Sequence, residues 1–126
     1  MLKESSMKKL ILLVIFIFAN AGDFEKGLEY YQKLNYTKAQ QFFIKGCQTD
    51  KKSCNYLGVL YENGLSVKKD IKKALRYYQI SCDANIAEAC INLGSLYSQL
   101  NQKDKAKNSF KKACNLGYKP ACYLAK

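Results

Sequence analysis

Apolar residues recur along the chain with the period of an α-helix. From Cys90 to Tyr97, and again at Ala106, Phe110 and Ala113, they return at three- and four-residue steps, which places them on one face of a helix. We expect such helices in consecutive pairs, each with a first helix (helix A) and a second helix (helix B). The A helices are expected at 24–34, 52–62 and 87–98, the B helices at 37–47, 70–82 and 103–115, and a short last helix from residue 120.

A sequence repeat runs through these helix pairs. Glycines followed three residues later by a tyrosine mark the A helices: Gly27, Gly58 and Gly94. Alanines followed by an aromatic residue at the fourth position and a cysteine at the eighth mark the B helices: Ala39, Ala74 and Ala106. A helix pair cannot bury its apolar face alone, so stacked neighbours complete the core. The sequence therefore predicts an all-α solenoid with repeats at 22–50, 51–86 and 87–118 and a partial unit at 119–126, which forms a C-terminal capping helix.

Local signals refine two features of the repeat. Gly58 and Gly94 are expected where paired helices approach closely, because glycine weakens a helix by up to about 1 kcal/mol and is retained where a side chain would clash. Asp70 is the best candidate to cap the N-terminus of a B helix, since its carboxylate can accept hydrogen bonds from unpaired backbone N–H groups.

The N-terminal segment has the layout of a secretory signal peptide. Lys8 and Lys9 precede an apolar run at 10–18, and Ala19-Asn20-Ala21 follows as a small-x-small cleavage site. The alternative is a membrane anchor, but a spanning helix needs about 20 apolar residues. We therefore expect cleavage after Ala21, a mature domain at 22–126 without a membrane span, and a secreted or periplasmic location.

Six cysteines remain in the predicted mature chain. An even number in a small exported protein indicates a disulfide framework, with free buried thiols as the alternative. The first cysteine of each pair ends a B helix and the second opens the next A helix, so the turn can bring their Cα atoms within the roughly 4.4–6.8 Å that a disulfide requires. The absence of a C-x-x-C motif favours a structural role over a redox role. The expected pairs are Cys47–Cys54, Cys82–Cys90 and Cys114–Cys122.

The chain is strongly basic, with a net charge of +11. Removal of residues 1–21 takes away three lysines and one glutamate, which leaves a charge of +9. This charge permits attraction to acidic surfaces or anionic peptides. The lysines are interpreted as spread over several helices, which favours a solvated surface, and no nucleic-acid role is expected. A basic group near one loop and helix leaves a polyanion binder open as an alternative: Lys68, Lys69, Lys72, Lys73 and Arg76.

The register of glycine, tyrosine, alanine, aromatic residue and cysteine resembles Sel1-like repeats, relatives of the tetratricopeptide repeat. The C-x7-C spacing in an exported chain is similar to that of the Helicobacter cysteine-rich proteins. The resemblance covers residues 23–126, although Asp23 and Lys26 depart from the pattern in the first unit, which resembles an N-terminal cap. It implies a right-handed solenoid that binds peptides or proteins on a concave surface lined by A helices. It also implies, as an alternative, weak penicillin binding or β-lactam hydrolysis, because family members carry a β-lactamase label.

Candidate peptide-binding residues follow from this implied surface. They occupy exposed A-helix positions one, four and five residues after each glycine, and three before it. Amides and a few apolar side chains at these positions suit recognition of a peptide backbone. The predicted contacts are Tyr31, Asn55, Val59, Glu62, Asn63, Ile91, Ser95 and Gln99. Further positions of the same rows are Phe24, Leu28, Gln32 and Ser98.

Catalysis finds little support in the sequence. In the predicted mature chain, two S-x-x-K matches begin at Ser66 and Ser109, but the companion S-D-N and K-T-G motifs of serine β-lactamases are absent. Ser109 precedes core-facing Phe110, and no pocket is expected beside it. Zinc hydrolases rely on histidine ligands, and the chain contains no histidine. The sequence therefore predicts no catalytic residue, no metal site and no cofactor, and it favours a binding module.

Overall fold

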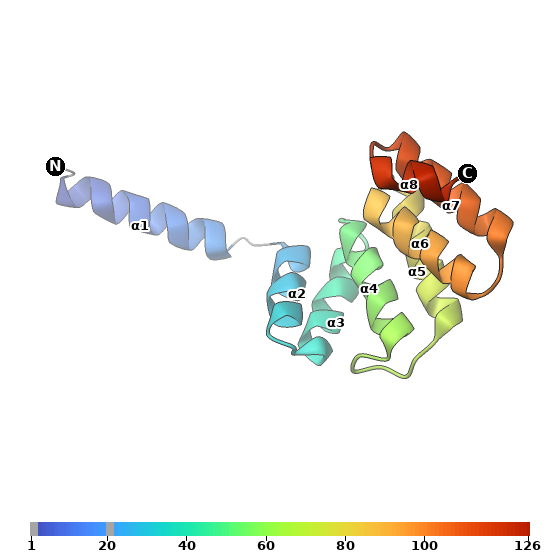
Figure 1. Ribbon diagram of the computed structural model, residues 1–126. Coiled ribbons are helices and arrows are strands. Elements are labelled where there is room, and N and C mark those ends of the chain that lie inside the picture. Colours follow the sequence, from blue (N-terminus) through green and yellow to red (C-terminus); the bar gives the residue numbers. More distant parts are fainter. Residues whose placement is uncertain (1–2, 20–21) are drawn as a thin grey trace.

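The computed structural model describes residues 3–19 and 22–126, which form helices joined by short turns. The first helix, α1 (Glu4–Ala19), projects away from the others in Figure 1. The predicted cleavage after Ala21 lies outside the described residues. Among the helices of the described segments, none is long and apolar enough to cross a membrane.

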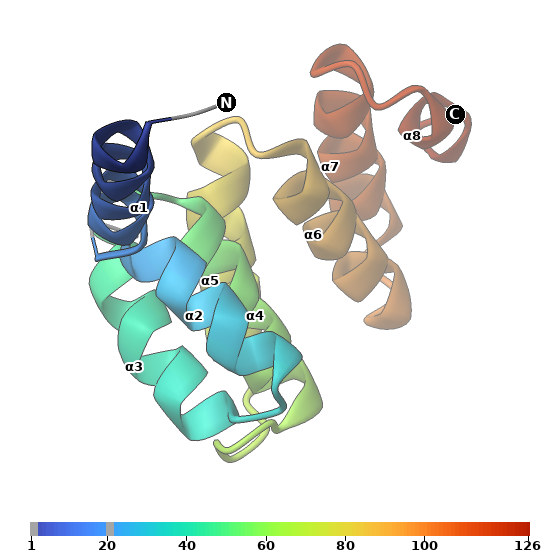
Figure 2. The ribbon, with the colours of Figure 1, turned by 90° about the vertical axis from the view of Figure 1, so that its left-hand side faces the viewer.

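The remaining helices form consecutive antiparallel pairs, as the apolar spacing predicts. Figures 1 and 2 show the pairs following one another from α2 to α8, with α2 lying beside α3 and α4. The observed boundaries differ from the expected ones by at most two residues. The A helices are α2 (Asp23–Gln32), α4 (Lys52–Asn63) and α6 (Ala87–Gln99), the B helices are α3 (Tyr36–Gly46), α5 (Ile71–Asp83) and α7 (Lys103–Asn115), and α8 (Lys119–Leu124) is the last.

Side-chain caps and a glycine set several of these boundaries. The Asp70 carboxylate accepts a hydrogen bond from the Lys73 backbone N–H at 3.0 Å, which confirms its predicted capping role. Asn35 caps α3 in the same way. At the other end of a helix, Gly64 terminates α4 with a φ of 64°, a left-handed conformation that glycine adopts without strain.

Close approach between paired helices explains the repeated glycines. A Cβ atom added to Gly58 would lie 2.5 Å from the Tyr78 ring of α5, and one added to Gly94 would lie 2.7 Å from the Phe110 ring of α7. The aromatic ring of each B helix therefore occupies the space that a side chain would need on the A helix. Both halves of the repeat signature, the glycine and the aromatic residue, serve this one contact.

The core consists of two neighbouring clusters of buried side chains. One surrounds Phe43 of α3 and Leu57 and Leu60 of α4. The other surrounds Tyr78 of α5 and extends over α6 and α7 to Ala121 of α8. The A helices α4 and α6 thus each pack against their own B helix and against the B helix before it, which is how stacked repeats complete a core that a single pair cannot.

The disulfides join the successive pairs, as the repeat register predicts. Their Cα–Cα distances are 4.8 Å for Cys47–Cys54, 4.7 Å for Cys82–Cys90 and 4.8 Å for Cys114–Cys122. The described residues contain no free cysteine. Each bond ties the end of one B helix to the start of the next A helix, so it fixes the junction between repeats.

Candidate functional site

A row of side chains crosses the outer faces of the three A helices. Spacings of three and four residues place these positions on one face of each helix, and none of the side chains is fully buried. We call this row the A-helix strip. It comprises Tyr31 on α2, Tyr56, Val59 and Asn63 on α4, and Glu88, Asn92, Ser95 and Gln99 on α6.

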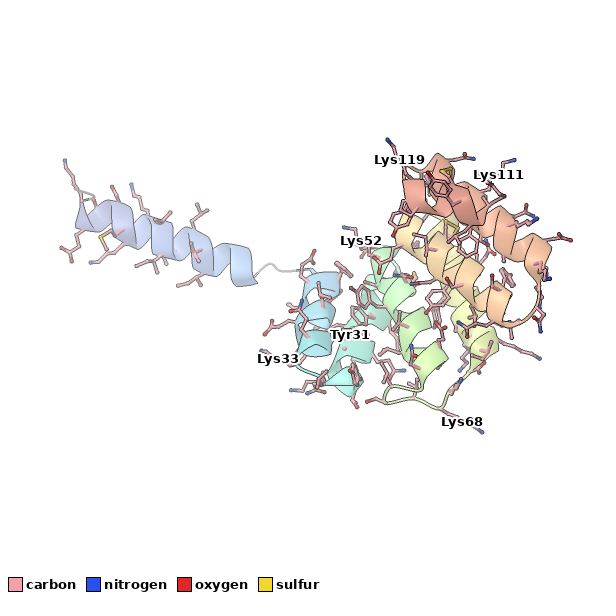
Figure 3. The ribbon with its side chains drawn as sticks, viewed as in Figure 1. Tyr31, Lys33, Lys52, Lys68, Lys111 and Lys119 are labelled. Atoms are coloured by element: carbon pink, nitrogen blue, oxygen red, sulfur yellow. A yellow bond between two sulfur atoms is a disulfide. The ribbon has the colours of Figure 1, made fainter. Side chains whose placement is uncertain are left out.

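Aromatic contact links the strip across the first two repeats. Tyr31, labelled in Figure 3, lies where α2 and α4 meet, and its ring centroid is 5.2 Å from that of Tyr56 in an edge-on arrangement. Partial burial raises the pKa of both phenols, and the Glu88 carboxylate of α6 adds to the rise in the Tyr56 pKa. The strip therefore combines two neighbouring phenol rings with a carboxylate from the next A helix.

Asn55 does not occupy the exposed position expected for it. Only 2% of its surface is exposed, and its Oδ1 accepts a hydrogen bond from Asn92 Nδ2 at 2.9 Å. Asn55 lies one residue before Tyr56, which turns it by about 100° around the helix axis toward the next repeat. The expectation that Asn55 is exposed is wrong, because its side chain holds α4 against α6.

Glu62 is likewise engaged inside the protein. It is half-buried, and its Oε2 accepts a hydrogen bond from the Tyr78 hydroxyl at 2.5 Å. Tyr78 is 1% exposed. Burial, followed by this hydrogen bond to Glu62, raises the pKa of Tyr78 well above its usual value.

The raised pKa of Tyr78 predicts a loss of stability in alkaline solution. Tyr78 ionises near pH 10 in the unfolded chain but keeps its proton in the folded protein, so the free energy of unfolding falls as the pH rises above about 10. One such group contributes at most about 1.4 kcal/mol per pH unit. Urea unfolding at pH values from about 8 to about 11, the range over which a free phenol ionises, measures this slope.

Two tyrosine variants separate this effect from other alkaline changes. The Tyr78→Phe variant is expected to have a shallower fall in stability above about pH 10 than the unsubstituted protein. Tyr123→Phe is the matched control, because Tyr123 is 75% exposed and its replacement is expected to leave the slope unchanged. Equal slopes in all three proteins would contradict the assignment to Tyr78.

The other predicted binding residues divide between the strip and the core. Asn63, Ser95 and Gln99 are exposed, as expected. Val59 and Ile91 are half-buried and pack against the larger core cluster, although Val59 also belongs to the strip. Ile91, like Asn55, precedes a strip residue by one position and turns away from the strip.

Sequence reasoning missed Tyr56, Glu88 and Asn92. Tyr56 and Asn92 stand two residues after the cysteine that opens their A helix, so the repeat register contains a signal for them. Counting from the glycine found the strip residues one and five positions after it, but the position three before it gave Asn55 and Ile91 in place of their neighbours Tyr56 and Asn92. The strip follows the helical spacing from these positions: 56, 59 and 63 on α4, and 88, 92, 95 and 99 on α6.

Lysines are spread over several helices, as expected, but the balance of acidic and basic residues differs between the two kinds of helix. The A helices carry more acidic than basic residues: Asp23, Glu25, Glu29, Glu62 and Glu88 against Lys26 and Lys52. The B helices have the opposite balance: Lys38, Lys45, Lys72, Lys73, Arg76, Lys103, Lys105, Lys107, Lys111 and Lys112 against Asp83 and Asp104. The A helices therefore carry a net negative charge and the B helices a net positive charge, although the chain as a whole is basic.

The S-x-x-K serines have different surroundings. Ser66 is exposed in the loop after α4. Ser109 lines a groove of about 310 Å³ between α5 and α7, so the expectation that no pocket lies beside it is wrong. Its Oγ donates a hydrogen bond to the Lys105 carbonyl oxygen at 3.0 Å. Within the described segments, no group of three His, Cys, Asp or Glu residues could hold a metal ion.

Family comparison agrees with the repeat architecture. The Sel1 repeat model matches residues 21–34, 24–48 and 51–86, and a tetratricopeptide repeat model matches residues 87–116. Together these matches cover almost all of the helix pairs described above. The chain belongs to the Sel1 repeat family.

Within that family, the chain is similar to the cysteine-rich proteins of Helicobacter pylori. The solved structure of cysteine-rich protein B superposes with a TM-score of 0.66 at 32% identity, covering 81% of this chain and 94% of that one. "Beta-lactamase HcpA" of H. pylori strain J99 is 49% identical over 52 residues, 40% of this chain and 21% of that protein. A Sel1 repeat protein from Oxalobacter formigenes has the same fold, with a TM-score of 0.66 at 22% identity, covering 82% of this chain and 53% of that one.

Other relatives have other names. "Cytochrome c oxidase assembly factor 7" of Xenopus tropicalis is 34% identical over 91 residues, which is 64% of this chain and 39% of that protein. The chain thus spans about two fifths of the length of this frog relative. The repeat is shared by proteins with different names, so the family alone does not define one activity.

Proposed function

We propose that the protein is an exported binding module that holds a segment of another protein along the A-helix strip. The observation that carries the proposal is the row of side chains that are not fully buried on three successive A helices, with Tyr31 in ring contact with Tyr56 and Asn92 bonded to Asn55 beside it. Repeat solenoids use extended surfaces of this kind to bind partners. Aromatic side chains supply contact area, and amides and carboxylates fix the orientation of the ligand.

The chemistry of the strip favours a segment with a basic side chain. Tyr56 and Glu88 lie close enough for the carboxylate to raise the phenol pKa, and a lysine or arginine of a partner placed between them would meet a π-face and a negative charge together. The acidic balance of the A helices acts in the same direction. The exposed amides Asn63 and Gln99 supply donors and acceptors for the backbone of the segment.

Export is the second part of the proposal. The basic, apolar and small-residue succession at 8–21 supports a signal peptide. The three disulfides support an oxidising compartment, either the periplasm or the exterior of the cell. Mass spectrometry of the protein recovered from cell fractions tests this part, since cleavage gives a mature chain that begins at Gly22.

Substitutions in the strip test the binding role. A random peptide display library selected on the oxidised mature protein is expected to yield sequences with a basic residue. The variants Glu88→Lys and Ser95→Arg are expected to weaken binding of a selected peptide by about tenfold or more, because each disrupts the centre of the contact. Isothermal titration calorimetry gives the dissociation constants.

The matched control places a charge change on the opposite face. Lys111→Gln on α7 alters an exposed B-helix residue and is expected to leave the affinity within about twofold of the original. Peptides that bind all three variants equally well would show that the strip is not the binding surface, and the proposal would then fail.

β-Lactam hydrolysis is the alternative that the family resemblance implies. The name of the HcpA relative is the reason to test it. A serine nucleophile needs a base that accepts its proton. The Ser109 hydroxyl donates instead to a backbone carbonyl, and no hydrogen bond in the described chain joins Ser66 or Ser109 to a lysine amino group. We therefore rank binding above hydrolysis. Nitrocefin turnover that a Ser109→Ala variant lacks would reverse this ranking.

A further inference from the structure

The groove between α5 and α7, to which α6 contributes Leu93 and Tyr97, contains no residue of the A-helix strip. Its floor includes Cys82 and Leu93, each 2% exposed. Its rim is polar and consists of Gln79 from α5, Lys105, Asn108, Ser109 and Lys112 from α7, and Tyr97 from α6. The volume of about 310 Å³ is at the lower end for a small-ligand site.

The basic side chains of the rim come from one face of α7. Lys105, Asn108, Ser109 and Lys112 follow one another at helical spacing, so their side chains form a single wall. The Lys105 ammonium lies 5.5 Å from the centre of the Tyr97 ring, and in the described segments it has no salt bridge with a carboxylate. The Lys112 ammonium is 4.0 Å from Asp83 Oδ1.

Asp83 identifies the kind of group that this wall attracts. Its carboxylate accepts a hydrogen bond from Gln79 Nε2 at 2.8 Å and lies at the limit of an ion pair with Lys112. The Asp83 side chain is 65% exposed, and exposed pairs of this length contribute little stability. An incoming anion can therefore replace Asp83 as the partner of Lys112 without a large loss, although Asp83 competes with it.

We propose that this groove binds a carboxylate, supplied either by an acidic side chain of a partner protein or by a small free carboxylic acid. The two ammonium groups and the Asn108 amide provide hydrogen-bond donors for the carboxylate oxygens. The apolar floor formed by Leu93 and the Cys82–Cys90 disulfide accommodates an aliphatic stem. The surplus of lysines on the B helices raises the local concentration of anions around the groove.

Titration of the oxidised protein with two probes tests the proposal. Glutarate represents the free acid, and a hexaglutamate peptide represents the acidic side chain. In ¹H–¹⁵N correlation spectra, both probes are expected to shift the amide signals of Gln79, Lys105, Asn108 and Lys112 first. If hexaglutamate binds about tenfold more tightly than glutarate, a protein segment is the source, whereas equal affinities indicate a small acid. Shifts confined to residues outside the groove would overturn the proposal.

Two double variants with the same change in charge separate the groove from the general basic surface. Lys105→Gln with Lys112→Gln is expected to weaken binding by about tenfold or more, since charged hydrogen bonds to the ligand are lost. Lys72→Gln with Lys111→Gln removes two lysines of the same helices, α5 and α7, that do not line the groove, and is expected to weaken binding by less than about threefold. Equal losses in the two variants would mean diffuse attraction alone and would refute a specific site.

Asp83 provides a test with the opposite sign. Asp83→Asn removes the competing carboxylate and keeps an acceptor for Gln79, so it is expected to tighten probe binding by about two- to fivefold. Unchanged or weaker binding in this variant contradicts the proposed geometry. Thermal unfolding of every variant, followed by circular dichroism, verifies that the fold is retained. Failure of these tests would leave the A-helix strip unaffected, because the groove shares no residue with it.

Discussion

Replacing Cys82 and Cys90 together with alanine is expected to lower the free energy of unfolding by about 2–5 kcal/mol. The disulfide closes a loop with a sequence separation of 8, and its loss restores conformational freedom to the unfolded chain. Both sulfurs are also buried, at 2% and 0% exposure, so the replacement removes apolar contacts at the junction of two repeats. Urea denaturation of the oxidised proteins, followed by circular dichroism, measures the change.

Cys114 and Cys122 offer a control with the same loop length. Their sequence separation is also 8, so the loop entropy is equal, but both residues are only half-buried. The double alanine variant at this pair is expected to lose about 1 kcal/mol less than the variant at Cys82 and Cys90. A larger loss at the C-terminal pair would mean that burial of the central sulfurs does not contribute as described.

Gly58→Ala is expected to destabilise the protein by about 1–3 kcal/mol, although alanine favours helices by about 1 kcal/mol over glycine. The new Cβ atom would lie 2.5 Å from the Tyr78 ring. Tyr78 cannot move aside easily, because it is 1% exposed and its hydroxyl is bound to Glu62. The helices α4 and α5 would have to separate, and thermal or urea unfolding reports the loss.

A double variant tests whether this contact is the cause. The Tyr78→Leu substitution removes the aromatic ring, so Gly58→Ala is expected to cost less stability in a Tyr78→Leu background than in the unsubstituted protein. The difference between the two costs, which is the coupling energy, is expected to be about 1 kcal/mol or more. Gly22→Ala is the control, because the nearest neighbour of its added Cβ is the flexible Glu25 carboxylate. Strictly additive losses at Gly58 and Tyr78 would contradict the steric explanation.

Helices and disulfides could be predicted because both depend on local sequence. The repeated steps from Gly58 to Tyr61 and from Ala74 to Cys82 fix which face of each helix is buried, and short turns leave few ways to join the pairs. Cysteines seven or eight residues apart at such a turn are brought together by the turn itself. The boundaries of the helices, the cysteine pairing and the Asp70 cap are therefore confirmed.

The candidate site was harder to predict from the sequence because it depends on contacts between repeats. A change of one residue along a helix turns a side chain by about 100°, which separates buried Asn55 from Tyr56 on the strip. The spacing within a single repeat does not show how closely the next A helix lies, and the hydrogen bond from Asn92 to Asn55 arises from that neighbour. The groove beside Ser109 is hidden for the same reason, since its rim combines α5 with α7.

The difference in charge between the A helices and the B helices was also difficult to predict from the linear sequence. Lysines occur in every repeat, so a count along the chain indicates an even distribution. Assigning them to helices shows that α7 alone carries Lys103, Lys105, Lys107, Lys111 and Lys112 against Asp104. The two proposals follow this division of charge, with a basic side chain proposed at the A-helix strip and a carboxylate proposed in the groove.

The placement of the disulfides also affects how such a chain can change length. Each bond spans one junction, and no bond connects distant repeats. Deleting residues 54–89 as one block would bring Cys90 to the position of Cys54, where it meets Cys47 at the same separation of 7. Duplicating that block would add one further complete pair. Whole repeats can therefore be lost or gained during evolution without leaving an unpaired thiol, so the number of units is free to vary while the oxidised fold is conserved.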